Sequence, residues 1–174
     1  MRYKILSSLA VAMLACGGGE EASPPPVEEV APPSVEQDSL AQARAEAAEV
    51  RRMVAQVINF DFDKSTIRPG PDTRVLQEKA AILTANPALA LEIVGHCDER
   101  GTRAYNQALG MRRAESARRY LVGLGVAQGR LTVSSMGEDQ PVDPGRNETA
   151  WAQNRRAEFR IVAGGDALRG ASGM

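Results

Sequence analysis

The amino-acid sequence predicts an α+β (α/β sandwich) fold in which helices pack on one small, mixed, four-stranded sheet. Two observations support this prediction. Short segments with alternating apolar and polar residues are typical of half-buried strands, and longer segments with apolar residues at helical spacing separate them. The 174 residues are 25% charged and 43% apolar, which is ordinary for a globular protein with one core. We therefore expect one folded domain with appended terminal segments.

Residues 1–15 are predicted to be a signal peptide for export. They combine a basic start with an apolar stretch that ends well short of the roughly 20 apolar residues a membrane-spanning helix needs. Cys16 directly follows Ala15, which resembles the lipobox of bacterial lipoproteins. This resemblance implies that Cys16 is lipidated and anchors the protein; a short secretory signal with an incidental cysteine is the alternative. Cys97 would then be the only free thiol, so no intramolecular disulfide is expected.

Residues 16–39 are expected to form a disordered linker, because they are rich in Pro and Glu and contain no Lys or Arg. Residues 40–56 contain no Gly or Pro and are rich in Ala, Arg and Glu, so they are predicted to form a helix that leads into the domain. From residue 40 onward the chain has 19 Lys and Arg against 16 Asp and Glu. This small excess argues against nucleic acid as a partner.

The folded domain is predicted to span residues 57–162, and it begins with a strand. In residues 57–63, Phe60 and Phe62 are expected on one face of that strand, opposite polar residues. A Pro-Gly-Pro sequence then breaks the chain, and Asp72 can cap a helix that ends before Asn86-Pro87. A second strand is predicted over residues 89–95.

The second half of the domain repeats this alternation. A helix is predicted over residues 102–124, with an apolar stripe on one face and glycines at its end. A strand over 131–136, a polar loop, a short helical turn over 149–155 and a last strand over 156–162 complete the domain. Residues 163–174 are expected to be disordered.

Asp98 and Arg113 give the strongest functional signal. A carboxylate just after a strand and a guanidinium along the next helix suit a zwitterionic ligand that carries an ammonium and a carboxylate. The carboxyl ends of strands are common ligand sites, and Arg113 follows Asn106 by seven residues, so both share one helical face. The alternative is structural: Asp98 forms an ion pair with Arg113 or caps the following helix.

Five short motifs surround this pair. They are Phe60-Asp61-Phe62-Asp63-Lys64, Gly95-His96-x-Asp98-Glu99-Arg100-Gly101-Thr102, Tyr105-Asn106-x-x-Leu109-Gly110-x-Arg112-Arg113-Ala114, Gly137-Glu138 and Asn154-Arg155-Arg156. Over about residues 55–162 the chain resembles the OmpA-like C-terminal domains, in the variant found in peptidoglycan-associated lipoproteins (Pal).

The resemblance implies a periplasmic domain that holds the diaminopimelate side chain of the peptidoglycan stem peptide without breaking a bond. Asp98 would bind the ligand ammonium and Arg113 a ligand carboxylate. The other residues implied to line the pocket are Phe62, Asp63, Thr102, Asn106 and Leu109. The resemblance further implies a lipid anchor in the cell outer membrane, and partnership with TolB and the Tol complex (the Tol-Pal system) in envelope integrity and cell division.

No enzymatic activity, cofactor or metal is expected. His96, Cys97 and Asp98 are neighbours, but alternate side chains of a strand point to opposite faces, so Cys97 is expected to point away from the other two. His96 is interpreted as a residue of the pocket edge or of the packing. No nucleophile with a base and an orienting partner can be assembled around Asp61 and Asp63.

Two alternatives to the Pal-like function remain. One is a wall-binding lipoprotein of a different envelope machine, and the less favoured one is a peptidoglycan hydrolase. Arg155, Arg156 and Trp151 are interpreted as structural residues that hold a loop or pack in the core.

Overall fold

The protein, as a computed structural model, is described over residues 35–166 and 168–170. The predicted signal peptide, the lipidation site Cys16 and most of the predicted linker lie outside the described residues. The described residues belong to one compact unit. Its α-helices are α1 (Val35–Ala55), α2 (Pro71–Ala85), α3 (Arg103–Gly123) and α4 (Glu148–Asn154). Within the described part of the chain, every helix is too short or too polar to span a membrane.

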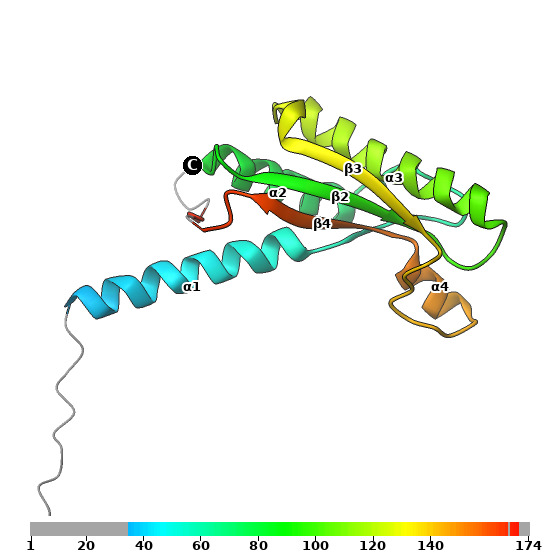
Figure 1. Ribbon diagram of the computed structural model, residues 1–174, viewed down its shortest axis with the longest axis horizontal. Helices are drawn as coiled ribbons and strands as arrows, with labels where there is room; N and C mark the ends of the chain where they lie inside the picture. The colour runs from blue at the N-terminus through cyan, green and yellow to red at the C-terminus, as the bar shows by residue number, and fades with distance from the viewer. Residues whose placement is uncertain (1–34, 167, 171–174) are drawn as a thin grey trace, which may run out of the picture. The chain divides into compact units, whose positions relative to one another are not determined.

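Four strands form one mixed sheet in the order β1-β4-β2-β3 (Figure 1). They are β1 (Ile58–Asn59), β2 (Ala90–His96), β3 (Leu131–Gly137) and β4 (Arg156–Ala163). β4 is antiparallel to both of its neighbours, whereas β2 and β3 are parallel and are joined by α3. A parallel pair needs a long crossover, and the 21 residues of α3 supply it. The predicted fold class is confirmed.

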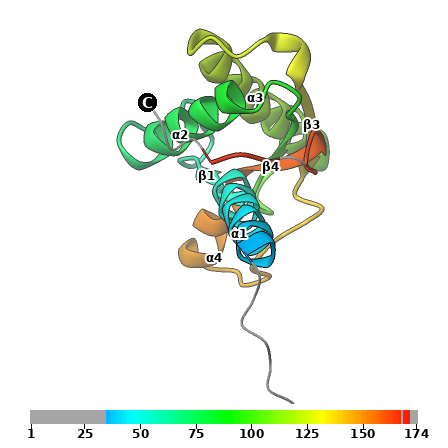
Figure 2. The ribbon, with the colours of Figure 1, turned by 90° about the vertical axis from the view of Figure 1, so that its left-hand side faces the viewer.

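The core lies between the sheet and the helices α2 and α3, which cover the same face of the sheet (Figures 1 and 2). Leu76 and Leu83 of α2 and Leu121 of α3 are fully buried there against Leu91 and Ile93 of β2. α1 adds Val50 and Val54 to the same core. This apolar contact explains why the predicted lead-in helix is part of the domain.

Two glycines bring α3 very close to β2. A Cβ atom on Gly95 would lie 1.8 Å from the carbonyl oxygen of Gly110, and one on Gly110 would lie 2.3 Å from Ser135 Oγ. No larger residue fits at either position, so the helix rests directly on the strand. This close approach sets the position of Arg113, one turn further along α3.

The first predicted strand is too long. Only Ile58 and Asn59 pair with β4, and the chain then turns, with Lys64 N donating to Asp61 O at 3.2 Å and Asp63 in the left-handed region at φ 56°. The two phenylalanines therefore do not share a face: Phe60 is buried, whereas Phe62 is 55% exposed. The alternating pattern was real, but it continued past the point where the partner strand ends.

Three smaller predictions also need correction. Gly70, not Asp72, is the N-cap of α2; the Asp72 carboxylate instead accepts hydrogen bonds from Asn59 N and Arg68 Nε. The last five residues of the predicted linker belong to α1. The predicted disordered tail is wrong for its described residues, because Leu168 is buried in the core and Arg169 N donates to Asn86 Oδ1 at 2.8 Å.

Candidate functional site

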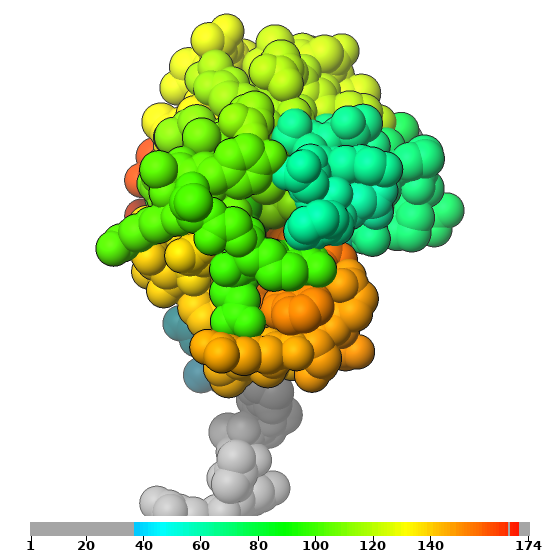
Figure 3. Space-filling view, turned by 90° about the vertical axis from the view of Figure 1, so that its right-hand side faces the viewer, coloured from blue at the N-terminus to red at the C-terminus, as the bar shows by residue number. Residues whose placement is uncertain are grey.

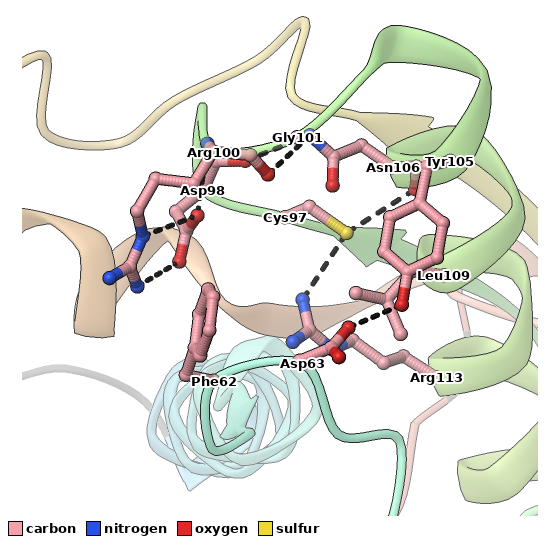
Figure 4. A pocket seen from close by; sticks show the side chains of 10 residues that line it. All are labelled: Phe62, Asp63, Cys97, Asp98, Arg100, Gly101, Tyr105, Asn106, Leu109 and Arg113. Carbon is pink, nitrogen blue, oxygen red and sulfur yellow. Dashed lines mark hydrogen bonds and ion pairs between the residues drawn. The ribbon is translucent and has the colours of Figure 1, made fainter.

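A cavity of about 200 Å³ opens where the chain leaves β2 and enters α3. Figure 3 faces this end of the domain, where the teal segment after β1, the green segment after β2 and the orange α4 meet. The lining residues, shown in Figure 4, are Phe62, Asp63, Cys97, Asp98, Arg100, Gly101, Tyr105, Asn106, Leu109 and Arg113. The structure thus brings the predicted ligand residues together around one cavity, except Thr102. Thr102 is the exposed N-cap of α3, and its Oγ accepts from Tyr105 N at 3.3 Å.

Arg113 forms the inner wall of the cavity and has no solvent exposure. Its Nε donates to Lys64 O at 2.9 Å, its Nη1 to His96 O at 2.7 Å, and its Nη2 to Asp61 O at 3.2 Å. Burial lowers the pKa of Arg113, yet a guanidinium stays charged in proteins. Arg113 therefore joins the segment after β1 to the end of β2 and places a fixed positive charge at the cavity.

Asp98 is 4% exposed and is paired with two other arginines. Arg100 Nη2 lies 2.7 Å from Asp98 Oδ2 and Arg155 Nη1 lies 3.2 Å from the same oxygen. Burial by itself would raise the pKa of Asp98, but the hydrogen bonds from Arg100 and Arg155 lower it below the usual value. Among the described residues no ion pair joins Asp98 to Arg113, and Thr102 caps α3, so neither structural alternative takes the expected form.

Aromatic side chains surround the mouth of the cavity. The Arg100 guanidinium lies between two rings, 4.0 Å from the centroid of Phe62 and 4.1 Å from that of Trp151. On the other side of the mouth, Tyr105 donates its hydroxyl to Asp63 Oδ1 (Figure 4). Phe62 and Tyr105 are both about half exposed, so the entrance is partly apolar. Trp151 was interpreted as a structural anchor, and its ring does support Arg100.

Asn106 and Leu109 complete the wall on the α3 side. Asn106 is buried, and its Nδ2 donates to Asp98 O and Arg100 O at 3.2 and 3.1 Å, so it holds the segment after β2 in its bent path. A third bond from the same nitrogen goes to Glu138 Oε2. Leu109 is also buried and gives the cavity an apolar surface. These two residues position the site rather than add charge to it.

Cys97 does not point away from Asp98 as predicted, because both line the cavity. The regular pleat of β2 ends with a register shift at Gly95 and His96, so alternation no longer holds beyond that point. Cys97 Sγ lies 3.3 Å from both Asn106 O and Arg113 Nη1. Burial raises the pKa of the Cys97 thiol to about 11, so it is uncharged at neutral pH.

His96 is fully buried outside the cavity lining, with Nε2 3.7 Å from Glu158 Oε1, which fits the packing role. Over residues 35–166 and 168–170, no three His, Cys, Asp or Glu side chains gather in a way that could hold a metal ion. Asp61 is exposed and lies 3.4 Å from Lys64 Nζ, whereas Asp63 pairs with Tyr105. The two carboxylates that were considered for hydrolysis thus have separate partners.

Sequence reasoning missed Arg100 and Tyr105 as lining residues. Both lie inside the quoted motifs, and a basic residue two positions after Asp98 was a signal that was not used. Arg155 was assigned a structural role, but its contact with Asp98 spans 57 residues of the chain. No local pattern could have predicted that contact.

Comparison with known proteins places this architecture in a wider group. The model of the OmpA family matches residues 59–155. A peptidoglycan-associated lipoprotein of Pseudomonas putida is 46% identical over 101 residues, which are 58% of this chain and 60% of that protein. One from Haemophilus influenzae is 45% identical over 100 residues, 58% of this chain and 65% of that protein. The match thus covers less than two thirds of the length of these curated relatives.

Solved structures show the same similarity. The crystal structure of the peptidoglycan-associated lipoprotein from Burkholderia pseudomallei aligns with a TM-score of 0.59 and 40% identity over 61% of this chain and 89% of that one. The C-terminal domain of Helicobacter pylori MotB aligns with a TM-score of 0.56 at 19% identity, over 61% of this chain and 83% of that chain. At that identity the second similarity concerns the fold alone.

Proposed function

Because this chain belongs to the OmpA family, we propose that it is a lipoprotein that binds peptidoglycan noncovalently and does not cleave it. The observation that supports this most directly is the cavity at the end of β2, with the Asp98 carboxylate and the Arg113 guanidinium in its wall. The relatives that are 45–46% identical are named as peptidoglycan-associated lipoproteins. A site of opposite fixed charges, whose one lining thiol, Cys97, is held uncharged by burial, suits binding rather than catalysis.

The proposed ligand is the diaminopimelate side chain of the stem peptide, whose end carries an ammonium and a carboxylate. Asp98 would accept from the ammonium. Within the described part of the chain, four hydrogen bonds use four of the five N–H groups of Arg113. One N–H on Nη2 is left for the ligand carboxylate. Phe62, Asp63 and Leu109 would contact the methylene chain and the rim groups.

A single grip of this kind is modest, because each charge-assisted hydrogen bond contributes about 1.5 to 3 kcal/mol. Firm attachment of the membrane to the wall would depend on avidity, because the wall presents many stem peptides and many copies of a membrane-anchored protein would bind them at once. Acylation of Cys16 would hold each copy at the outer membrane, with the described domain in the periplasm. The protein would thereby link membrane and wall.

The partnership with TolB and the Tol complex, and a role in cell division, are part of the same proposal and derive from the resemblance to Pal. Co-purification with TolB tests this part. A wall-binding protein that does not retain TolB would belong to a different envelope machine.

Sedimentation with purified diaminopimelate-type sacculi tests the binding function. The full chain with Cys16→Ser, which cannot be acylated, is compared with the same chain carrying Asp98→Asn. Asp139→Asn is the matched control, because Asp139 is a carboxylate paired with the exposed Arg103 away from the cavity. We expect the parent and the control to sediment with the wall and Asp98→Asn to stay in solution. Equal sedimentation of all three would remove Asp98 from the site, and release of soluble muropeptides would indicate a hydrolase.

A further inference from the structure

The carboxylate that is proposed to bind the ligand ammonium is already occupied by a cation of the protein itself. Arg100 binds Asp98 with two parallel hydrogen bonds, Nε to Oδ1 at 3.1 Å and Nη2 to Oδ2 at 2.7 Å (Figure 4). This bidentate form is the strongest arrangement for such a pair. In the described structure, Arg100 therefore sits where the ammonium of a zwitterion would have to go.

Asp98 has no capacity left for a further donor. Its two oxygens offer about four acceptor sites. Besides the two bonds from the Arg100 side chain, Oδ1 accepts from Arg100 N at 3.1 Å and Oδ2 accepts from Arg155 Nη1 at 3.2 Å. An ammonium can bind this carboxylate only if one of the present donors leaves.

The two arginines differ in how firmly they are held. The Arg155 side chain is 7% exposed, and it also donates to Phe60 O at 3.0 Å and to Glu148 Oε1 at 2.7 Å. The Arg100 side chain is 30% exposed, and beyond Asp98 its charged partner is Glu148, 3.5 Å away. Arg155 is thus held by a main-chain carbonyl oxygen, whereas Arg100 can turn outward, away from the rings of Phe62 and Trp151.

We propose that Arg100 is an exchangeable internal counter-ion of Asp98, which the ammonium of the ligand displaces. This inference depends on the proposed function and adds to it a residue that determines specificity. The exchange conserves charge: one cation leaves the carboxylate and another arrives. The displaced guanidinium stays at the mouth of the cavity, where the nearby Glu148 carboxylate is already paired with Arg155, so it needs a further anion.

This requirement selects zwitterions over singly charged ligands. A ligand with an ammonium and an adjacent carboxylate replaces Arg100 at Asp98 and offers the displaced Arg100 a carboxylate. A diamine displaces Arg100 and leaves it only Glu148, which it shares with Arg155, so the diamine binds less well. A dicarboxylate leaves the pair of Arg100 and Asp98 intact and cannot use Asp98 at all. Because of Arg100, a tightly bound ligand must therefore carry both an ammonium and a carboxylate.

Calorimetric titration tests the inference with three probes that share a five-carbon chain and differ in the charged groups attached to it. They are meso-2,6-diaminopimelate, pimelate, which lacks the amines, and 1,5-diaminopentane, which lacks the carboxylates. The full chain with Cys16→Ser is compared with Arg100→Met, which keeps an unbranched side chain between the rings, and with Arg103→Met as a control on an exposed arginine. We expect Arg100→Met to bind diaminopentane at least tenfold more tightly. Its preference for diaminopimelate over diaminopentane should fall at least tenfold, with no change in the control.

A second readout needs no variant. Trp151 is the only tryptophan of the chain, and Arg100 stacks on its ring. Displacement of Arg100 should therefore change the tryptophan emission of the parent on addition of diaminopimelate but not of pimelate. If the parent binds diaminopimelate with unchanged emission, or if Arg100→Met weakens binding of both amines equally, Arg100 is a fixed part of the site and the inference is wrong. If the parent binds none of the probes, the proposed function itself fails, and this inference fails with it.

Discussion

Among the residues that the structure describes, two cations are completely buried, one in the core beside α1 and one in the wall of the cavity. Lys79 of α2 donates from Nζ to Met53 O at 2.8 Å and to Val54 O at 2.7 Å, and lies 4.4 Å from the ring centroid of Phe159. Arg113 likewise donates to main-chain carbonyl oxygens and lies 5.3 Å from the ring centroid of Phe60. Burial and the type of acceptor are therefore the same in both regions.

What differs is the surroundings and the chemistry of the cation. Arg113 borders a cavity that also contains a carboxylate, whereas Lys79 joins α1 to α2 inside the apolar core. Burial lowers the pKa of Lys79 to about 7, but an arginine cannot lose its proton in this range. Of these two buried cations only Arg113 adjoins a cavity, so only Arg113 is a candidate for ligand binding. Arg113 also keeps its charge near neutral pH, whereas Lys79 loses part of its charge there.

The largest effect is expected for Arg113→Met. Removing this side chain leaves three carbonyl oxygens without their donors, at about 1 to 3 kcal/mol each, so the unfolding free energy should fall by about 3 kcal/mol or more. Sedimentation with sacculi should be lost as well. Urea unfolding measures the first effect. Arg119→Met is the control, because Arg119 is exposed on the same helix and contacts Ser116. An unchanged unfolding free energy for Arg113→Met would mean that the two cations are not comparable.

Lys79→Met should separate the two regions. Its folded pKa of about 7 lies below the unfolded value of about 10.4, so the unfolded state binds more protons between these two pH values. The unfolding free energy of the parent should therefore rise by about 3.5 kcal/mol from pH 7 to pH 10 relative to Lys79→Met. Binding of diaminopimelate at pH 7 should be the same in both proteins. If both proteins show the same pH dependence, Lys79 keeps its charge as Arg113 does.

The order of the elements could be predicted from the sequence because it depends on local pattern, whereas most of the six predicted residues that line the cavity came from the resemblance to the OmpA-like domains. Periodicity located every α-helix and three of the strands within a few residues, and three of the motifs together contain all ten residues that line the cavity. It failed where a distant segment decides the outcome. The first strand ends early because β4 offers it only two partners, and Asp98 is paired with Arg155, 57 positions away.

The smallest effect is expected for His96→Leu, which concerns a third buried group lying one residue before the cavity. Both ring nitrogens of His96 lack hydrogen-bond partners among the described residues, and burial, followed by the charge of Arg156, lowers its pKa to about 4. Its unfolded value is about 6.5, so the stability it contributes is present above pH 6.5 and is lost as the pH falls through 4. The parent should lose about 2 kcal/mol more unfolding free energy between pH 7 and pH 5 than His96→Leu, as measured by urea unfolding. Lys79→Met should show nearly the full acid loss, because the Lys79 pKa of about 7 lies at the upper edge of this window and its titration there changes the unfolding free energy by only about 0.4 kcal/mol. Diaminopimelate affinity at pH 7 should change less than about twofold in His96→Leu, because the ring lies outside the cavity lining. An affinity loss as large as that of Asp98→Asn would instead show that the binding site includes His96, so that this buried residue of β2 belongs to the site and not only to the packing.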